Sequence, residues 1–257
     1  MGIASNWLPQ LREACVAAGR AILAFRGHDA DVREKLDGSP VSAADHAAAR
    51  IVCDCLQRLD PAIRVICEEG ARDAGDSSAF WLVDPLDGTR EFLRGGELFT
   101  VNVALVRDGR PQLGVIHAPA SGLCWWGAIG IGAFHGDVRI RTRACVDAPR
   151  LLLSPAEDPR APGSWLHALL AAWPRLQVDR LPGALKFCRL AEGDADFYVR
   201  HVPSYAWDTA AGQAIVEAAG GVVYGAAGDA LCYRGGDWRN GAFFAAGDAR
   251  AAGNFAW

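Results

Sequence analysis

The chain has 257 residues, of which 51% are hydrophobic and 22% charged, and its formal net charge is −4. This composition excludes a disordered chain, and the length allows one large domain or two smaller ones. No apolar run reaches the roughly 18 residues of a membrane-spanning helix, no secretory signal is evident, and the negative charge gives no general attraction to nucleic acid.

The first quarter of the chain predicts two helices and a strand. Apolar residues recur at helical spacing over residues 5–26, and the polar residues 28–40 predict a loop or weak hairpin. A second helix is predicted over Ser42–Leu59, where Ser42 and Asp45 stand in the Ser-x-x-Asp relation of a helix start. A short apolar strand, 64–67, follows and runs into two glutamates.

The segment from Phe80 to Thr89 predicts a strand-to-helix corner. An apolar run ends in Asp84, and Pro85 is expected to stop the strand because proline has no N–H. Gly88 allows a close approach of the backbone, and Thr89 would open a short helix whose free N–H groups favour a phosphate. An antiparallel meander is predicted next, with strands at 99–107, 112–118, 122–128 and 131–135.

The composition turns polar and basic near residues 139–149, which predicts a domain junction. We therefore expect an N-terminal α+β domain over residues 1–145 with an antiparallel sheet, and a C-terminal layered domain over 146–257. In the second half, predicted strands alternate with helices at 164–173, 184–191 and 207–220. This rhythm is typical of layered α/β proteins, so the predicted fold class is α/β.

The cysteines and histidines show no metal-ligand spacing. There are eight cysteines without a C-x-x-C pair, and six scattered histidines. We expect the cysteines to be reduced packing residues and the protein to be cytoplasmic. Peripheral attachment to the inner membrane does not follow from the sequence.

Five acidic residues interrupt apolar segments: Glu68, Glu69, Asp84, Asp87 and Asp208. If they converge, a divalent cation is the simplest way to offset their repulsion. Oxygen ligands suit Mg²⁺ or Mn²⁺, and two such ions about 3.5–4 Å apart recur in phosphatases. The alternatives stay open here: a solvated turn for Asp84 and Asp87, helix-end electrostatics for Asp45, and a helix N-cap for Asp208.

Three motifs carry a resemblance to a known family: Glu68-Glu69, Asp84-Pro85-Leu86-Asp87-Gly88-Thr89 and Trp207-Asp208. Their order and separations are similar to the signatures of the inositol monophosphatase superfamily, which are lithium-sensitive, Mg²⁺-dependent phosphomonoesterases. The resemblance runs from the first helix nearly to the C-terminus and implies an αβαβα sandwich. Finer features, such as Ser39 to Asp45 and Leu185-Lys186-Phe187-Cys188, resemble the CysQ-type 3′(2′),5′-bisphosphate nucleotidase branch.

The resemblance implies the metal ligands. Glu68, Asp84 and the Leu86 carbonyl would hold the ion that binds the attacking water, and Asp84, Asp87 and Asp208 the ion at the leaving oxygen. The implied cofactor is Mg²⁺, as two or three ions, with Mn²⁺ as a substitute and Li⁺ or Ca²⁺ as inhibitors.

The catalytic and substrate-binding residues are implied in the same way. Thr89, paired with Asp45, would orient and help deprotonate the water, with Glu69 in a supporting position. Gly88 and Thr89 would offer N–H groups to the phosphate.

Substrate choice is expected in the second half. Lys186, Arg200 and Asp208 would line the substrate, although a solvated face is the alternative for the two cations. The polyol phosphatases of the family usually have an acid at the position of Arg200, so a guanidinium there favours a second phosphate. Gly183-Ala184 departs from the branch's usual Gly-Ser-Ser, which leaves the exact nucleotide open.

The resemblance implies a phosphomonoesterase that removes the 3′-phosphate of adenosine 3′,5′-bisphosphate by in-line attack of metal-activated water, with 3′-phosphoadenylyl sulfate as a second candidate substrate. The alternatives are an inositol, sugar or histidinol monophosphatase with the same metals, and a non-catalytic scaffold. The expected partner is a small phosphorylated nucleotide, with no nucleic acid and no transmembrane segment. Monomer and homodimer are both left open.

Overall fold

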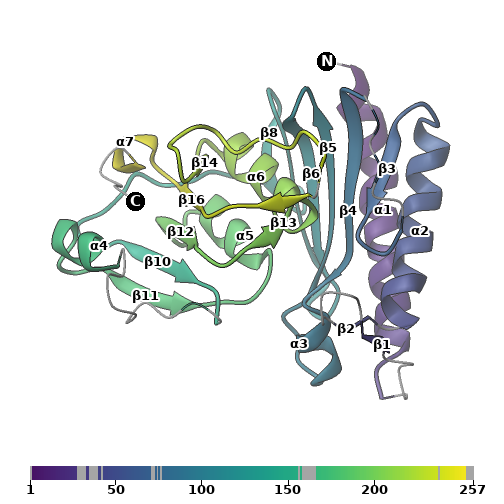
Figure 1. Cartoon of the computed structure of the whole chain (residues 1–257), viewed down its shortest axis with the longest axis horizontal. Coiled ribbons are helices and arrows are strands. Elements are labelled where there is room, and N and C mark those ends of the chain that lie inside the picture. The colour runs from purple at the N-terminus through teal and green to yellow at the C-terminus, as the bar shows by residue number, and fades with distance from the viewer. Residues whose placement is uncertain are drawn as a thin grey trace.

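The computed structural model describes residues 2–27, 33–34, 40–41, 43–70, 73, 75, 77–155, 157, 166–236 and 238–252. Its helices are α1 (Gly2–Ala24), α2 (Ala43–Leu59), α3 (Thr89–Leu93), α4 (Leu166–Ala172), α5 (Leu185–Ala191), α6 (Ala206–Ala219) and α7 (Ala249–Ala252). Together with four sheets they form five layers, helices and sheets alternating across the molecule (Figure 1).

The larger sheet has seven strands in the order β3-β4-β5-β6-β7-β8-β9. Only β3 and β4 pair in parallel, and the other neighbours are antiparallel hairpins, as the meander predicts. The strands are β3 (Arg64–Cys67), β4 (Ala79–Asp87), β5 (Thr100–Arg107), β6 (Arg110–Ala118), β7 (Leu123–Ala128), β8 (Gly132–His135) and β9 (Val138–Ile140).

Both faces of this sheet are buried. On β4, Trp81 and Val83 pack with α1 and α2, while Phe80 and Leu82 face the core that holds α5 and α6. Side chains alternate between the faces of a strand, so a strand covered on both sides must be apolar throughout. This explains the unbroken apolar run that ends in Asp84.

The second sheet has five strands in the order β11-β10-β12-β16-β14, and its pairing is mixed parallel and antiparallel. Two strand pairs, β1-β2 and β13-β15, lie outside the large sheets. The strands are β1 (Arg33–Glu34), β2 (Pro40–Val41), β10 (Arg150–Leu153), β11 (Gln177–Arg180), β12 (Phe197–Arg200), β13 (Ser204–Tyr205), β14 (Val222–Gly225), β15 (Arg239–Asn240) and β16 (Phe243–Ala246).

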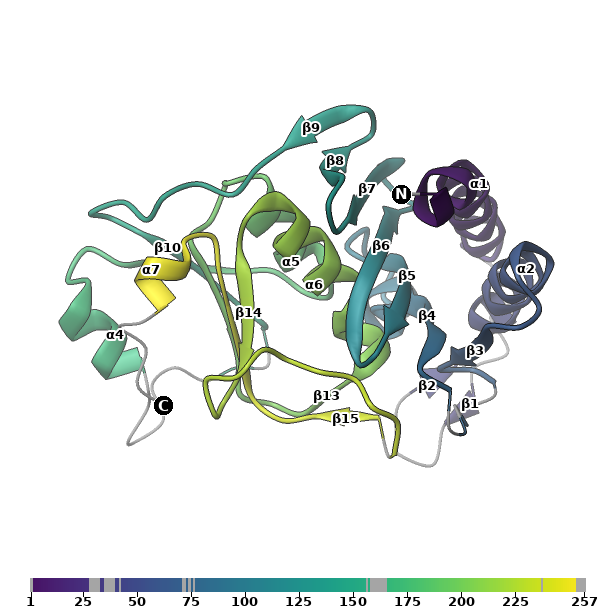
Figure 2. The ribbon, with the colours of Figure 1, turned by 90° about the horizontal axis from the view of Figure 1, so that it is seen from above.

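Helices α5 and α6 lie between the two sheets, with α1 and α2 outside the first sheet and α4 and α7 outside the second (Figure 2). The predicted α/β class and αβαβα sandwich are confirmed. Helix α6 is rich in small residues because it lies against the first sheet: a Cβ on Gly127 of β7 would come within 2.8 Å of the Ile215 backbone. The first turn of α6, which carries Asp208, lies near Asp84 at the end of β4.

The division at residue 145 stays a prediction, because the sheets separate on either side of residues 141–149 but share the core around α5 and α6. The sequence missed four short elements, β9, β13, β15 and α7, which are too brief to show a period. Ser42, of the predicted helix start, and residues 164–165, of the predicted fourth helix, lie outside the described residues.

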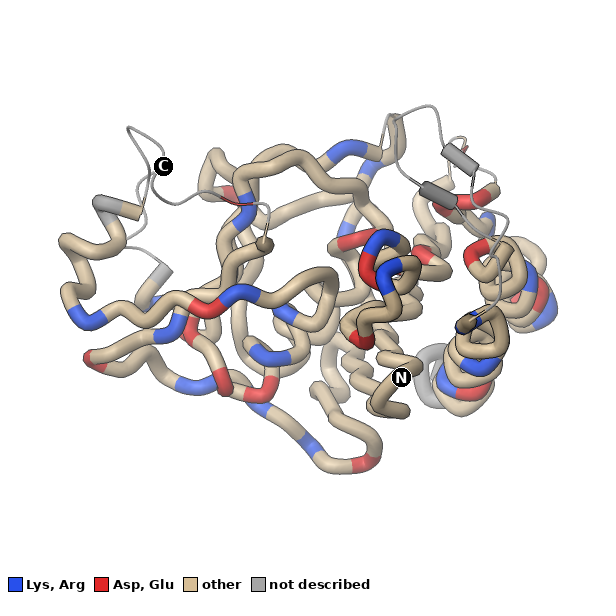
Figure 3. Tube along the Cα trace, turned by 90° about the horizontal axis from the view of Figure 1, so that it is seen from below, with Lys and Arg blue, Asp and Glu red and all other residues tan. Residues whose placement is uncertain are grey.

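All eight cysteines are free. In the part of the chain that the structure describes, no helix combines the length and apolarity needed to cross a bilayer. Among the described residues, acidic and basic positions are interspersed over the face shown in Figure 3.

Candidate active site

The predicted corner lies at the end of β4, but the strand does not stop at Pro85. It continues to Asp87, with a register shift between Asp84, opposite Asn102, and Asp87, opposite Thr100. Since β3 ends opposite Val83, the far side of β4 has no partner there, and a residue without an N–H is tolerated. Asp84 continues the alternation of Phe80 and Leu82 and so faces the space between the sheets, and the bulge brings Asp87 to the same side, where it contacts Ala184.

Gly88 and Thr89 complete the corner as predicted. Gly88 has φ of 96°, a left-handed conformation, and a Cβ would meet the Leu98 carbonyl oxygen at 3.3 Å. Thr89 is the first residue of α3. Glycine at this position therefore allows the chain to pass directly from strand to helix.

The structure brings four of the predicted carboxylates together. Glu68 follows β3, which pairs in parallel with β4, so Glu68 lies level with Asp84, and their side chains are hydrogen-bonded. Asp84 is 1% exposed, and burial, followed by the charges of Glu68, Asp87 and Asp208, raises its pKa well above the ordinary value. Asp208 therefore lies close enough to Asp84 to change its pKa, although the two residues are more than a hundred positions apart in the sequence.

Asp208 is the third residue of α6, and its Oδ2 accepts the N–H of Tyr205 at 2.9 Å. The residue therefore stabilises the helix start, although it is not the N-cap, which is Tyr205. Burial, then the charges of Asp87 and Glu68, raise the pKa of Asp208 to about 7. Ionisation of Asp84 or of Asp208 in this environment therefore costs free energy.

Three of the four carboxylates, those of Asp84, Asp87 and Asp208, accept a backbone N–H group. The Oδ1 of Asp84 accepts the Leu86 N–H at 3.0 Å, and the Oδ2 of Asp87 accepts the Ala184 N–H at 2.6 Å. Among the described residues, no set of three His, Cys, Asp or Glu side chains already stands in a metal-binding arrangement. The donor set itself, one buried and three half-buried carboxylates in mutual repulsion, fits a hard divalent cation such as Mg²⁺.

Thr89 and Asp45 are in direct contact. The Thr89 Oγ1 lies 3.0 Å from Asp45 Oδ1 and 3.1 Å from the Leu86 carbonyl oxygen, and its single proton can be donated to one of them at a time. Asp45 is 1% exposed on α2, so this contact joins α2 to the corner. Glu69 is half-buried beside Glu68, and its role stays a prediction.

The two predicted cations come from the C-terminal half. Lys186 is fully buried, and its Nζ donates to the carbonyl oxygens of Leu181 and Gly183, each at 2.8 Å. Burial lowers the pKa of Lys186 to about 7, against the opposing charge of Asp87. Arg200, at the end of β12, is partly exposed and donates to the carbonyl oxygens of Val202 and Pro203 at 3.2 and 3.4 Å.

Sequence reasoning missed Asn102. This residue of β5 is 1% exposed; its Oδ1 accepts the Thr100 hydroxyl at 2.9 Å, and its Nδ2 lies 3.5 Å from the Asp87 Oδ2. An amide inside the apolar run of residues 100–106 was the available signal, because buried polar side chains need partners. Asn102 and the Ala184 N–H thus both contact the Oδ2 of Asp87.

Gly183→Ala is expected to lower kcat/KM by about tenfold or more, because the added methyl group would displace the carboxylate of Asp87. Gly183 has φ of 58°, and a Cβ would lie 2.7 Å from the Asp87 Oδ2. Steady-state kinetics of purified enzyme would measure the loss. Gly228→Ala is the control, since Gly228 has φ of 80° with open space around it, and it should keep full activity. Equal effects of the two changes would contradict the argument.

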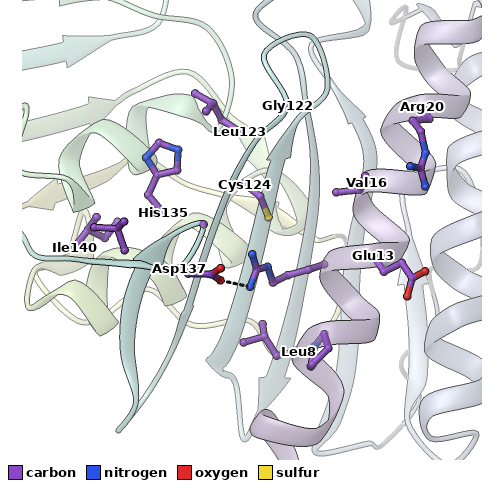
Figure 4. Close-up of a pocket in the computed structure, with 14 residues that line it drawn as sticks. Leu8, Glu13, Val16, Arg20, Gly122, Leu123, Cys124, His135, Asp137 and Ile140 are labelled. Atoms are coloured by element: carbon purple, nitrogen blue, oxygen red, sulfur yellow. Dashed lines mark hydrogen bonds and ion pairs between the residues drawn. The ribbon is translucent and has the colours of Figure 1, made fainter.

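A separate cavity of about 1150 Å³ lies between α1 and the β7–β9 end of the first sheet (Figure 4). Arg12 spans it to Asp137 at 2.8 Å, while Leu8, Val16 and Cys124 contribute apolar lining. None of its lining residues is a predicted site residue, so this cavity is distinct from the carboxylate site.

The sandwich, with acidic side chains from both halves gathered at a strand-to-helix corner, defines the class of protein as a layered α/β enzyme. The model of the inositol monophosphatase family matches residues 4–255. The chain belongs to the inositol monophosphatase family, which confirms the prediction from the three motifs.

Relatives within the family point to one branch. The chain is 39% identical over 206 residues to the 3′(2′),5′-bisphosphate nucleotidase CysQ of Escherichia coli strain K12, covering 79% of this chain and 83% of that protein. It superposes on the crystal structure of CysQ from Bacteroides thetaiotaomicron with a TM-score of 0.82 and 30% identity, covering 96% and 99% of the two chains. It is 32% identical over 185 residues to a fructose-1,6-bisphosphatase/inositol-1-monophosphatase of Thermotoga maritima, covering 71% and 70%.

Proposed function

We propose that this enzyme is a Mg²⁺-dependent, lithium-sensitive phosphomonoesterase that removes the 3′-phosphate of adenosine 3′,5′-bisphosphate, and of 3′-phosphoadenylyl sulfate. The observation that carries this proposal is Arg200, a cation at the edge of the carboxylate site. The charge of Arg200 acts on Asp208, whose pKa it lowers against the raising effect of burial. A guanidinium there suits a second phosphate.

The proposed metal ligands are Glu68, Asp84, the Leu86 carbonyl, Asp87 and Asp208. When bound, Mg²⁺ would lower the pKa of water and offset the charge that develops on the transferring phosphate. The side chains and carbonyl of this set come from both halves of the chain, so substrate would bind where the two sheets face each other.

The chain's own residues then orient the reaction. Asp45 accepts the hydroxyl proton of Thr89, 3.0 Å away, which leaves the lone pairs of Thr89 Oγ1 to accept a proton from the attacking water. The water attacks phosphorus in line with the leaving 3′-oxygen. The P–O3′ bond breaks as the new P–O bond forms, and the 3′-oxygen leaves as a hydroxyl after taking a proton from solvent. The backbone N–H groups of Gly88 and Thr89 would bind the phosphate oxygens. Glu69, in the turn after β3, would help to keep the neighbouring Glu68 in position.

On the substrate side, Lys186 fixes the loop around Gly183 through two carbonyl oxygens, while Arg200 supplies the permanent positive charge. The charges of both Asp87 and Arg200 act on Asp208, so this proposed metal ligand would meet the sugar as well as the ion. This arrangement supports recognition of a nucleotide with two phosphates.

A substrate panel tests the proposal. With Mg²⁺ present, kcat/KM for adenosine 3′,5′-bisphosphate is expected to exceed that for inositol 1-phosphate by about 100-fold, since one charge-assisted phosphate contact contributes about 1.5–3 kcal/mol. Chelation should abolish both activities, and millimolar lithium should inhibit. A preference for the inositol ester would instead favour the monophosphatase alternative, which the Thermotoga maritima relative represents.

A further inference from the structure

Glu157 is a buried carboxylate that the proposed chemistry does not use. It is 6% exposed, and charged side chains are rarely so buried without a partner. Its Oε1 accepts the backbone N–H groups of His201 at 2.9 Å and Val202 at 3.2 Å. Within the described residues, Glu157 forms no ion pair, so these two amides are its hydrogen-bond partners there.

The turn that carries Glu157 is itself held firmly. The Glu157 N–H donates to the Ser154 carbonyl oxygen at 3.0 Å. The Arg180 Nη1 lies 3.1, 3.2 and 2.9 Å from the carbonyl oxygens of Ser154, Pro155 and Glu157. These contacts hold the Glu157 carboxylate in place as a hydrogen-bond acceptor just after the C-terminal end of β10.

The loop that Glu157 binds also orients Arg200. The Arg200 Nε donates to the Val202 carbonyl oxygen and its Nη2 to that of Pro203. Val202 therefore uses both backbone groups: its N–H contacts Glu157, and its carbonyl contacts Arg200. The same loop connects β12, which ends in Arg200, to β13 and the start of α6.

We infer that Glu157 is a positioning residue that sets the preference for substrates with a second phosphate by fixing the 201–203 loop against which Arg200 lies. This inference rests on the proposed function. Without the carboxylate of Glu157, the N–H groups of His201 and Val202 would bind water instead. The carbonyl groups of Val202 and Pro203 would then lose their fixed orientation, and Arg200 would spend less time in position to bind the second phosphate. Apart from Asp208 on α6, the proposed residues at the reacting phosphate lie on elements that the 201–203 loop does not adjoin. Asp208 keeps its contact with the Tyr205 N–H, which does not involve Glu157.

Glu157→Ala is expected to raise KM for adenosine 3′,5′-bisphosphate roughly tenfold, the effect of losing one oriented charge-assisted contact, with kcat within about twofold. KM for adenosine 3′-monophosphate, which lacks the second phosphate, should change less than about twofold. Glu157→Gln keeps the accepting oxygen and removes the charge, so it should restore the wild-type KM. A loss of kcat on both substrates alike would overturn the inference.

Two further variants separate orientation from folding. Glu157→Asp keeps the charge but shortens the side chain, and KM for the bisphosphate should rise to an intermediate value even if the alanine variant is unstable. In an Arg200→Ala background, Glu157→Ala should add less than about twofold, because the two residues act as one unit. Independent, multiplicative effects would show that Glu157 does not act through Arg200.

Failure of this inference is distinguishable from failure of the proposed function. If wild-type enzyme binds the bisphosphate and the 3′-monophosphate equally well, the role of Arg200 in binding a second phosphate is wrong, and the role of Glu157 with it. If wild-type enzyme prefers the bisphosphate and Glu157→Ala keeps the same preference, only the inference about Glu157 is wrong.

Discussion

Asp84→Asn is expected to reduce kcat/KM by about 10³-fold, because a metal ligand contributes several kcal/mol to the transition state. Asparagine has the same shape and can still accept the Leu86 N–H, so the fold should persist. The same change should stabilise the Mg²⁺-free protein, because it removes a charge that burial and three neighbouring carboxylates disfavour. One pKa unit is about 1.4 kcal/mol, and 1 kcal/mol moves Tm of a chain this size by about 2–4 °C.

Thermal unfolding with and without Mg²⁺ would separate these effects. Wild-type protein should gain about 2.7 kcal/mol at a Mg²⁺ concentration 100 times Kd, and Asp84→Asn should gain almost none. Asp196→Asn is the matched control: Asp196 is 1% exposed but is paired with Arg143 at 2.6 Å, so its loss should lower Tm and leave the Mg²⁺ response intact. A fully active Asp84→Asn variant would contradict the metal-site account.

The pH dependence of Mg²⁺-free stability should follow the same carboxyls. The pKa of Asp208 is raised to about 7, so between roughly pH 4 and 7 the folded state holds a proton that the unfolded state has released. The contribution of Asp208 to stability is therefore fully present below about pH 4 and is lost as the pH rises to about 7. Mg²⁺ should flatten this fall, since it binds the ionised form; a fall of the same size at saturating Mg²⁺ would count against the site.

Arg200→Glu is expected to lower kcat/KM for adenosine 3′,5′-bisphosphate by about 100-fold or more while changing that for adenosine 3′-monophosphate much less. The change replaces the cation proposed to bind the second phosphate with an anion, whose charge would act on Asp87 and Asp208. Kinetics on both substrates would measure the ratio. Since the monophosphate reports on the reacting centre alone, it separates recognition from chemistry.

Arg189→Glu is the control for this charge reversal. Arg189, on α5, is half-exposed and pairs with Glu192 and Asp194 rather than with the site. Its replacement should leave the substrate ratio within about twofold, because exposed charges are screened. An unchanged ratio in Arg200→Glu would instead show that the second phosphate binds elsewhere.

The sequence predicted the elements of the fold well where the pattern is local. Strand 64–67, the helix ending at Leu59 and the glycine-dependent corner at Gly88 follow from periodicity, apolar runs and backbone freedom. The predicted strand end was wrong. Proline ends a strand only where the neighbouring strand requires an N–H from that position, and β3 ends opposite Val83, before it reaches Pro85. How far β3 extends is a property of the sheet that the local sequence does not show.

The sequence by itself determined the composition of the site: acids at strand ends, a Gly-Thr corner and two basic residues in the second half. Only the tertiary structure decided that Asp208 reaches Asp84, that Thr89 contacts Asp45, and that Glu157 holds the loop beside Arg200. The reason is physical. Short-range sequence patterns set local conformation, whereas contacts between distant residues depend on how buried faces pack, and no local spacing encodes that packing.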